Sequence, residues 1–353
     1  MNMSYKNSMP KVSIIMPVYN SEKYVGEAIQ SIINQTYKDF ELIVIDDCCK
    51  DKSAEVISGF HDDRIVFIRN KENKGFLYGL NLGIEIAKGE YIARLDDDDV
   101  SYPERLEKQV EYMDTHQDVV LLGTKIDLLI NNERVFGEDV PIYTSEQIVF
   151  SLPFGNYCIA HSSFMMRKSI LMANNIRYEI FKQTPDYHML LQMCLFGKLS
   201  CLDEVLVTWR IHPQQSTQVR SPQMKMEEDD RVRCIHIDEM CLTPEKRMVL
   251  KKAVCRDLLT KEDYCLFKEV FEEYAKMCKL SLHDDKDIKC MQYVWKRILV
   301  QQRHNMKLFN AYISAMWVDK RWLFTTKVGI AFVIKCMIKY NKKWFPTIYD
   351  YNG

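Results

Sequence analysis

Residues 89–99 read Gly-Glu-Tyr-Ile-Ala-Arg-Leu-Asp-Asp-Asp-Asp. A turn glycine, a short apolar run and four consecutive carboxylates follow one another, which predicts a buried strand over 91–95 that ends at Asp96. Four adjacent carboxylates repel one another, so the arrangement makes physical sense where a divalent cation lies among them. A solvated acidic turn is the alternative that the four aspartates alone leave open.

Working outward from this segment, the chain before it alternates between apolar runs and amphipathic stretches. Strands are expected at 12–16, 41–45 and 64–69, and helices at 25–33, 53–60 and 79–88. This alternation predicts an α/β fold with a parallel sheet. We expect Asn20 or Ser21 to cap the first helix, because short polar side chains accept hydrogen bonds from the free amides of a first turn.

The expected strands end in polar residues. The stretches after three of them are Pro17–Asn20, Asp46–Asp47 and Asp96–Asp99. Ligands of open α/β sheets bind beyond the carboxyl ends of the strands. The sequence therefore predicts that these stretches lie near one crevice.

Composition narrows the class of protein. The 353 residues carry a formal net charge of -1, which gives no support for nucleic-acid binding. The 12 cysteines include the adjacent pair Cys48–Cys49 but form no C-x-x-C pair, so we expect reduced thiols and no zinc ribbon. The first residues are polar and the apolar run at 328–334 is short, so we expect a cytoplasmic protein without a signal peptide or a spanning helix.

A set of short motifs follows in fixed order along residues 11–220. They are Val12-Ser-Ile-Ile-Met-Pro-Val-Tyr-Asn20, Ser31-Ile-Ile-Asn-Gln-Thr-Tyr-Lys-Asp-Phe-Glu-Leu-Ile-Val-Ile-Asp-Asp47, Asn73-Lys-Gly75, Asn81-Leu-Gly83, the segment 89–99 with Pro103-Glu-Arg-Leu106, His161-Ser-Ser-Phe-Met-Met-Arg-Lys168, Pro185-Asp-Tyr187 and Trp209-Arg-Ile-His212. In this order and spacing the chain resembles the inverting GT-A glycosyltransferases of family 2, of the bacterial polysaccharide and lipopolysaccharide type. The resemblance implies a nucleotide-sugar-binding sheet with a D-x-D motif.

The resemblance also implies how the nucleotide-sugar is held. Pro17, Tyr19 and Asp47 would contact the base and ribose. Lys74 would contact the nucleotide, although a lysine beside a turn glycine is often only solvated.

A cation site follows from the same resemblance. Asp96, Asp97 and Asp98 would form the D-x-D element, with Asp98 as the principal ligand of Mn²⁺ or Mg²⁺ and the other two nearer the ribose and the water shell of the metal. His212 would reach the metal or the diphosphate. A hydrogen-bonded structural histidine is the alternative for His212.

Asp186 matches the catalytic base of the family. An inverting transfer is a single displacement in which one carboxylate takes the proton of the acceptor hydroxyl. A helix N-cap is the alternative role, since Asp is a favoured capping residue. The family often has Glu before this position and Arg six residues after it, where this chain has Pro185 and Gln192. This departure leaves the acceptor in doubt.

The resemblance implies a division into two regions. Residues 1–220 would form the catalytic domain, with a nucleotide-sugar half at 11–120 and an acceptor half at 121–220. Within the second half we expect short strands, loops and one helix at about 187–196. Residues 221–353 are highly charged and are expected to be helical.

The resemblance implies transfer of a hexosyl or N-acetylhexosaminyl group from a UDP-sugar to a hydroxyl of a glycan or lipid-linked acceptor, in bacterial surface polysaccharide synthesis. A dehydrogenase is a poor alternative, because no G-x-G-x-x-G follows the first strand. A sugar nucleotidyltransferase, or a non-catalytic module that binds nucleotide-sugars, remains the alternative.

Basic and aromatic residues mix between Lys320 and Phe345. Such a segment suits a helix at an anionic membrane surface, here the inner face of the plasma membrane. It equally suits a helical subdomain that packs on the catalytic domain or on a partner subunit. The sequence does not predict the oligomeric state.

Overall fold

The computed structural model describes residues 9–301, except 132, 137–139, 141, 143, 156–158, 180, 182–183, 216–220, 256, 258 and 282. The basic aromatic segment at 320–345 lies outside the described residues. The membrane-surface helix and the packed helical subdomain expected there therefore both stay predictions. The chain forms two compact units. The first comprises Met1–Asp139, Tyr143–Ile148 and Asn156–Asp229, and the second Val140–Ile142, Val149–Gly155 and Asp230–Gly353. The domain boundary expected after residue 220 stays a prediction.

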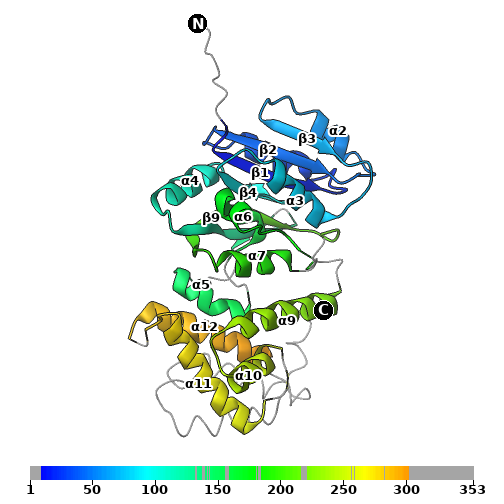
Figure 1. Cartoon of the computed structure of the whole chain (residues 1–353). Helices are drawn as coiled ribbons and strands as arrows, with labels where there is room; N and C mark the ends of the chain where they lie inside the picture. Colours follow the sequence, from blue (N-terminus) through cyan, green and yellow to red (C-terminus); the bar gives the residue numbers. More distant parts are fainter. Residues whose placement is uncertain are drawn as a thin grey trace. The chain divides into compact units, whose positions relative to one another are not determined.

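The first unit is built on one mixed sheet (Figure 1). Its strands are β1 (Val12–Val18), β2 (Phe40–Asp46), β3 (Ile65–Arg69), β4 (Tyr91–Arg94), β5 (Val100–Ser101), β6 (Val119–Ile130), β7 (Glu133–Phe136), β8 (Met165–Arg167) and β9 (Lys198–Ile211). The strand order is β3-β2-β1-β4-β8-β6-β9-β5, and β7 pairs with β6. The pairs β1–β2, β1–β4 and β2–β3 are parallel, as the alternating pattern predicts.

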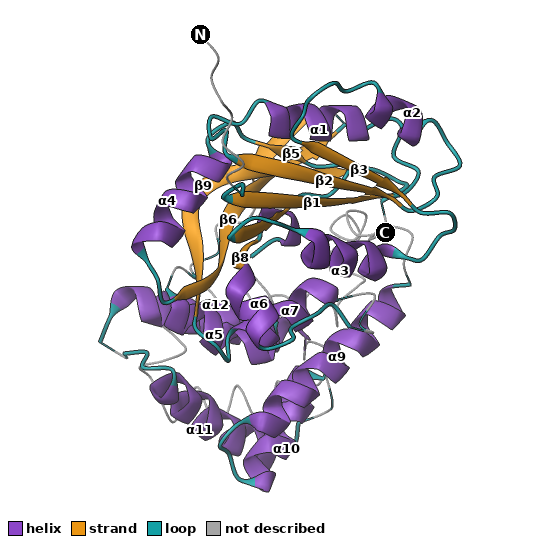
Figure 2. Cartoon of the chain, turned by 45° about the horizontal axis from the view of Figure 1, so that its top comes forward, coloured by secondary structure: helices purple, strands orange, loops and turns teal. Residues whose placement is uncertain are grey.

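Helices cover this sheet. They are α1 (Val25–Ile33), α2 (Ser53–Ser58), α3 (Phe76–Ile86), α4 (Arg105–Thr115), α6 (Lys168–Ala173) and α7 (Pro185–Met193), with α5 (Ser145–Ser151) and the short 3-10 turns η1 (Leu152–Phe154) and η2 (His161–Ser163) in the connections. Figure 2 shows α1 and α2 over one face of β1–β3 and α3 over the opposite face. The first three helices therefore lie where the sequence expects them, although α3 begins three residues before Gly79.

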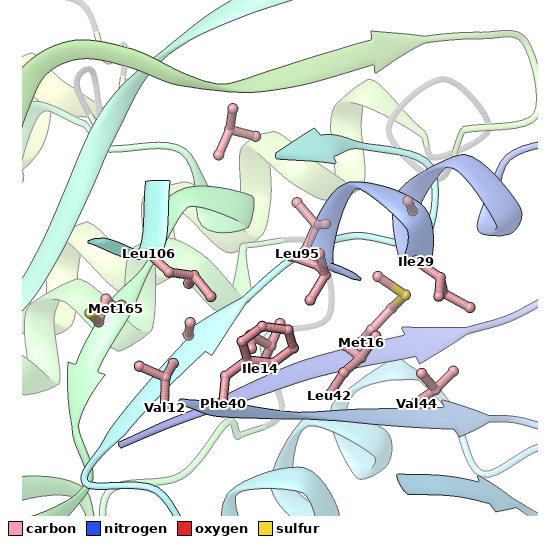
Figure 3. Packing of buried hydrophobic residues seen from close by; sticks show 14 of the residues in the cluster. Val12, Ile14, Met16, Ile29, Phe40, Leu42, Val44, Leu95, Leu106 and Met165 are labelled. Atoms are coloured by element: carbon pink, nitrogen blue, oxygen red, sulfur yellow. The ribbon is translucent and has the colours of Figure 1, made fainter. Parts of the chain in front are cut away.

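One hydrophobic core lies between the sheet and the helices α1 and α4 (Figure 3). Its strand members alternate along each strand, as Ile14 and Met16 do on β1 and Leu42 and Val44 on β2. The intervening residues face α3. There a Cβ added at Gly83 would stand 2.5 Å from the Cγ2 of Ile15, so α3 approaches β1 through a glycine face. This close approach holds the start of α3 beside the ends of the parallel strands.

Two local expectations are wrong. The N-cap position of α1 belongs to Tyr24, and no side chain caps the helix. Asn20 instead adopts a positive φ of 53° and accepts a hydrogen bond from the Lys50 amide, while the Ser21 hydroxyl donates to the Asp97 carbonyl. The middle of the chain also forms two long parallel strands, β6 and β9, where short strands were expected.

The second unit is helical over its described residues. It contains α10 (Pro244–Val254), α11 (Lys261–Met277), α12 (Asp285–Gln301) and the end of α9 (Pro222–Glu239). Phe150 and Phe154 pack their rings against Phe271 and Tyr274, and the Tyr274 hydroxyl donates to the carbonyl of Val149. These contacts assign the short segment at 149–155 to the helical unit.

Every helix in the described part of the chain is too short or too polar to cross a membrane. The cysteines at described positions are free thiols. The Sγ atoms of Cys234 and Cys255 lie 3.6 Å apart.

Candidate active site

The ends of β1, β2 and β4 meet at one edge of the sheet in the first unit. The Tyr19 amide donates to Asp97 Oδ2 at 3.1 Å, and the Asp47 amide donates to the Val18 carbonyl at 2.9 Å. Pro17 lies in the same strand end and contacts the α3 glycine Gly79. The three stretches that the sequence singles out are therefore neighbours in space.

Asp47 organises the loop that leads into α3. Its Oδ1 accepts hydrogen bonds from the side chain of Asn70 and the amide of Lys74, both at 2.8 Å, and its Oδ2 accepts from the amide of Gly75 at 2.7 Å. The ammonium group of Lys74 lies over the ring of Tyr78, 4.6 Å from its centroid. The carboxylate thus holds the turn, in which Gly75 has a φ of 89°.

Asp96 is held at both of its carboxylate oxygens. Arg94 Nη2 donates to Oδ1 at 2.5 Å, and the Ser162 hydroxyl donates to Oδ2 at 2.7 Å. Burial alone would raise the pKa of Asp96, but the charge and hydrogen bond of Arg94 outweigh it and hold that pKa below its ordinary value. These contacts therefore favour the ionised form of Asp96.

Asp99 is fully buried beneath the cluster. Its Oδ1 accepts from the Arg210 amide at 3.0 Å, and its Oδ2 is in short contact with the Ser162 hydroxyl. Burial, followed by the charges of Asp98 and Asp96, raises the pKa of Asp99 well above its ordinary value. Ser162 thus links Asp99 to Asp96 and ties the turn η2 to the acidic segment.

The Asp98 side chain contacts His212, which directly follows β9. His212 Nε2 lies 2.9 Å from Asp98 Oδ2, and the imidazole packs on the ring of Tyr24 with centroids 4.4 Å apart. Arg210 Nε donates to the Asp98 carbonyl at 2.9 Å and its Nη2 to Glu27 at 2.5 Å. The end of β9 is thereby joined both to the acidic segment and to α1.

The carboxyl groups of Asp97 and Asp98 also have pKa values above the ordinary value. Burial comes first for both Asp97 and Asp98. The charges of Asp98 and Asp96 then raise the pKa of Asp97 further, and the charge of Asp96 raises that of Asp98. Such a cluster favours a bound cation, whose charge would stabilise the ionised carboxylates.

The chemistry of the donor set fits a divalent cation. Single carboxylate oxygens of Asp96, Asp98 and Asp99 all lie within 4.8 Å of one another. An all-oxygen set of this kind suits Mg²⁺ or Mn²⁺. The group contains Asp99, to which the sequence reasoning gave no role, and it leaves out Asp97, whose Oδ2 accepts from the Tyr19 amide.

Asp186 lies in the first turn of α7. The N-cap position of this helix belongs to Thr184, so the capping role considered for Asp186 is wrong. Burial raises the pKa of Tyr178 above its ordinary value, and the charges of Asp186 and Asp96 act in the same direction. The Tyr178 hydroxyl lies 2.8 Å from His161 Nε2.

Sequence reasoning missed three residues of this site: Arg94, Asp99 and Ser162. Arg94 stands two positions before Asp96 at the end of a strand, a spacing that places both on one face. Ser162 lies inside the His161–Lys168 motif, but nothing in the sequence indicates that its hydroxyl lies between two aspartates.

Sequence comparison decides the family. The model of glycosyl transferase family 2 matches residues 13–173. An uncharacterized glycosyltransferase of Methanocaldococcus jannaschii is 35% identical over 209 residues, which cover 57% of this chain and 71% of that protein. This chain belongs to glycosyl transferase family 2. It is a glycosyltransferase.

One relative of this chain has a named role. The O-antigen biosynthesis glycosyltransferase WbnJ of Escherichia coli is 36% identical over 214 residues, which cover 59% of this chain and 82% of that protein. Residues 1–349 of TarS of S. aureus, solved in complex with UDP-GlcNAc, superpose with a TM-score of 0.58 at 18% identity, over 94% of this chain and 92% of that one. The fold is therefore of the GT-A type with helices in its C-terminal region.

Proposed function

We propose that this family 2 enzyme transfers a sugar from a nucleotide-sugar, specifically a UDP-sugar, to a hydroxyl of a glycan or lipid-linked acceptor with inversion at the anomeric carbon. The observation that carries the proposal is the group of carboxylate oxygens from Asp96, Asp98 and Asp99 at the edge where the parallel strands end. Diphosphates bind at such an edge when a cation offsets the repulsion between the two sets of negative charge.

Asp98 and His212 would hold Mn²⁺ or Mg²⁺, with Asp96 and Asp99 beside them. The bound cation would stabilise the negative charge on the leaving nucleoside diphosphate. The carboxylates of this site are oriented by hydrogen bonds. Arg94 and Ser162 donate to Asp96, and the Arg210 amide donates to Asp99. A mannosyltransferase of Pyrobaculum calidifontis, solved with GDP-Man and Mn²⁺, superposes at a TM-score of 0.50 and 14% identity and shares the fold.

The nucleotide would lie along the ends of β1 and β2. Tyr19 is 51% exposed and offers an aromatic surface for the base, whereas Pro17 is buried at the end of β1 and would support this place from within. Asp47 and the turn at Lys74 would close the other side. The UDP-GlcNAc complex of TarS favours a uracil nucleotide over the alternatives.

Asp186 would act as the general base. In one displacement, the bond between the acceptor oxygen and the anomeric carbon forms while the bond between that carbon and the diphosphate oxygen breaks. The proton of the acceptor hydroxyl passes to the Asp186 carboxylate, and the nucleoside diphosphate leaves. No covalent sugar–enzyme intermediate is required, so one base suffices.

The relatives support a place in polysaccharide synthesis. WbnJ is named for O-antigen biosynthesis, and the Bacillus subtilis protein EpsE, a putative glycosyltransferase, is 46% identical over 168 residues. A lipid-linked acceptor would bring the enzyme to the inner face of the plasma membrane. Flotation with anionic liposomes, comparing the full chain with one ending at residue 311, tests this part: equal flotation would contradict it.

The proposed reaction is tested with a panel of UDP-, GDP- and dTDP-sugars in Mn²⁺ or Mg²⁺. We expect metal-dependent release of nucleoside diphosphate from a UDP-sugar, and a product of opposite anomeric configuration by NMR. Formation of a nucleoside triphosphate and a sugar 1-phosphate, when pyrophosphate is added to the same panel, would instead identify a nucleotidyltransferase. Calorimetric binding of a nucleotide-sugar without turnover, in the presence of bacterial glycolipid extracts, would indicate a binding module.

A further inference from the structure

Arg94 is a buried cation with unused hydrogen-bonding capacity. The residue is 1% exposed, and among the described residues Nη2 is the one guanidinium nitrogen with a hydrogen bond, to Asp96. Its Nε and Nη1 are buried and have no hydrogen-bond partner among the described residues. Burying a guanidinium with two unsatisfied donors is costly. Stability alone therefore does not account for an arginine at this position.

The surroundings of Arg94 direct its charge to the acidic segment. The Phe76 ring covers one side, with its centroid 5.0 Å from Cζ. Arg105, a second buried cation, donates from Nη2 to the Arg94 carbonyl at 2.7 Å. Burial lowers the pKa of Arg94, but the charge and hydrogen bond of Asp96 outweigh it and raise that pKa above its ordinary value. The charge of Arg94 is thus directed chiefly at Asp96.

Arg94 and Ser162 act on the two oxygens of the same carboxylate. Their contacts to Asp96 measure 2.5 Å at Oδ1 and 2.7 Å at Oδ2. A carboxylate bound at both oxygens cannot turn about its terminal torsion without losing a hydrogen bond. Asp96 is therefore oriented by the protein, whereas Asp98 has its side-chain contact at Oδ2 with His212.

We propose that Arg94 is a positioning residue of the cation site: its guanidinium holds Asp96 in place, so that the oxygens of Asp96, Asp98 and Asp99 share one small volume. The inference rests on the proposed function, because it assumes that this cluster binds a divalent cation. Residues that orient metal ligands typically contribute about 10- to 100-fold to metal affinity.

The test is Arg94→Lys in the full-length chain, which keeps the positive charge but removes the planar fork. Mn²⁺ alone is titrated into the protein, and free Mn²⁺ is followed by electron paramagnetic resonance, with UDP or GDP added in parallel arms. We expect the affinity for Mn²⁺ to fall about tenfold. The matched control is Arg167→Lys, because Arg167 is also buried but donates to the carbonyls of Val119 and Met113. This control should leave Mn²⁺ affinity unchanged.

A double-mutant cycle with Asp96→Asn separates positioning from general stability. If Arg94 acts through Asp96, Arg94→Lys should have no further effect on Mn²⁺ affinity in the Asp96→Asn background. If Arg94→Lys does not fold, Ser162→Ala replaces it, with the same expected loss. Wild-type affinity in a folded Arg94→Lys protein would overturn the inference alone. A wild-type protein that binds no divalent cation, with or without nucleotide, would overturn the cation site as well.

Discussion

The imidazole of His212 meets the carboxylate of Asp98 at 2.9 Å, across 114 positions of sequence. This contact joins the end of β9 to the acidic segment after β4. The imidazole also packs on Tyr24 of the loop before α1. Through these two contacts, His212 links the start of the first helix, the acidic segment and the end of β9.

His212→Ala should raise the Mn²⁺ concentration needed for half-maximal activity about tenfold, because the cation would lose a proposed ligand and Asp98 would lose the partner that orients it. The measurement is nucleoside diphosphate release against Mn²⁺ concentration. His116→Ala serves as the control, since His116 is exposed and stacks on Tyr112 away from the site. Equal metal dependence in the two variants would contradict the role of His212.

Asp47→Asn should weaken nucleotide binding about tenfold and lower the free energy of unfolding by about 1–3 kcal/mol, because an amide group would replace one acceptor of the Lys74–Gly75 turn. Calorimetry with UDP and urea unfolding measure the two effects. Asp62→Asn is the control. Asp62 accepts from Arg64 before β3, at the opposite end of the strands. Unchanged UDP affinity in Asp47→Asn would show that the loop plays no part in binding.

Gly83→Ala should destabilise the protein by about 1–3 kcal/mol, since the new Cβ would stand 2.5 Å from Ile15 Cγ2. Gly26→Ala is the matched helical control, because its Cβ would meet Val56 Cγ1 at 3.3 Å, a contact that a small shift relieves. Urea unfolding curves for both variants check this. The packing of α3 on β1 would need revision if Gly83→Ala were as stable as wild type.

Thermal stabilisation by Mn²⁺ should be larger at pH 7.5 than at pH 6. The raised pKa values of Asp97, Asp98 and Asp99 mean that the metal-free folded protein binds protons that the unfolded chain releases near its lower, ordinary pKa. The metal-free protein therefore loses stability as pH rises through the raised values, and the cation must displace fewer protons there. Differential scanning fluorimetry measures this, with Asp98→Asn as the control that should respond weakly at both pH values. A Mn²⁺ effect that shrinks as pH rises would argue against the site.

Local patterns predicted the parallel half of the sheet well. The apolar spacing of α1 reproduces its bounds, Val25–Ile33, because that periodicity records burial against β1 and β2. The capping expectation failed because Asn20 and Ser21 are held by tertiary partners, Lys50 and Asp97, that lie far along the chain. No local pattern carries such contacts.

The long strands β6 and β9 escaped prediction for a related reason. Their pairing shifts register near Thr124 and Lys125, which breaks the alternation of apolar and polar residues. Asp127 is buried within β6 and accepts a hydrogen bond from the Tyr102 hydroxyl. An aspartate in the middle of a segment favours a loop when the sequence is considered alone. The sequence does not show that the Tyr102 hydroxyl would satisfy the buried Asp127 carboxylate.

The donor side of the candidate site followed from strand ends and motif order, whereas its supporting contacts did not. Ser162 and Asp99 are 63 positions apart, and the Arg210 amide that binds Asp99 is 111 positions away. These juxtapositions depend on the antiparallel pairs β4–β8 and β5–β9. The assignment of Asp186, Asp98 and the nucleotide-binding residues stays a prediction until variants are measured.

The most direct measurement compares Asp186→Asn with wild type for turnover and for donor binding in the same preparation. We predict that kcat falls at least about 100-fold, the lower range for loss of a general base. The affinity for UDP and Mn²⁺ by calorimetry should stay within about twofold, a difference of about 0.4 kcal/mol. An Asp186→Asn enzyme that retains wild-type kcat would contradict the account, because the carboxylate on α7 would then not be the base of the transfer.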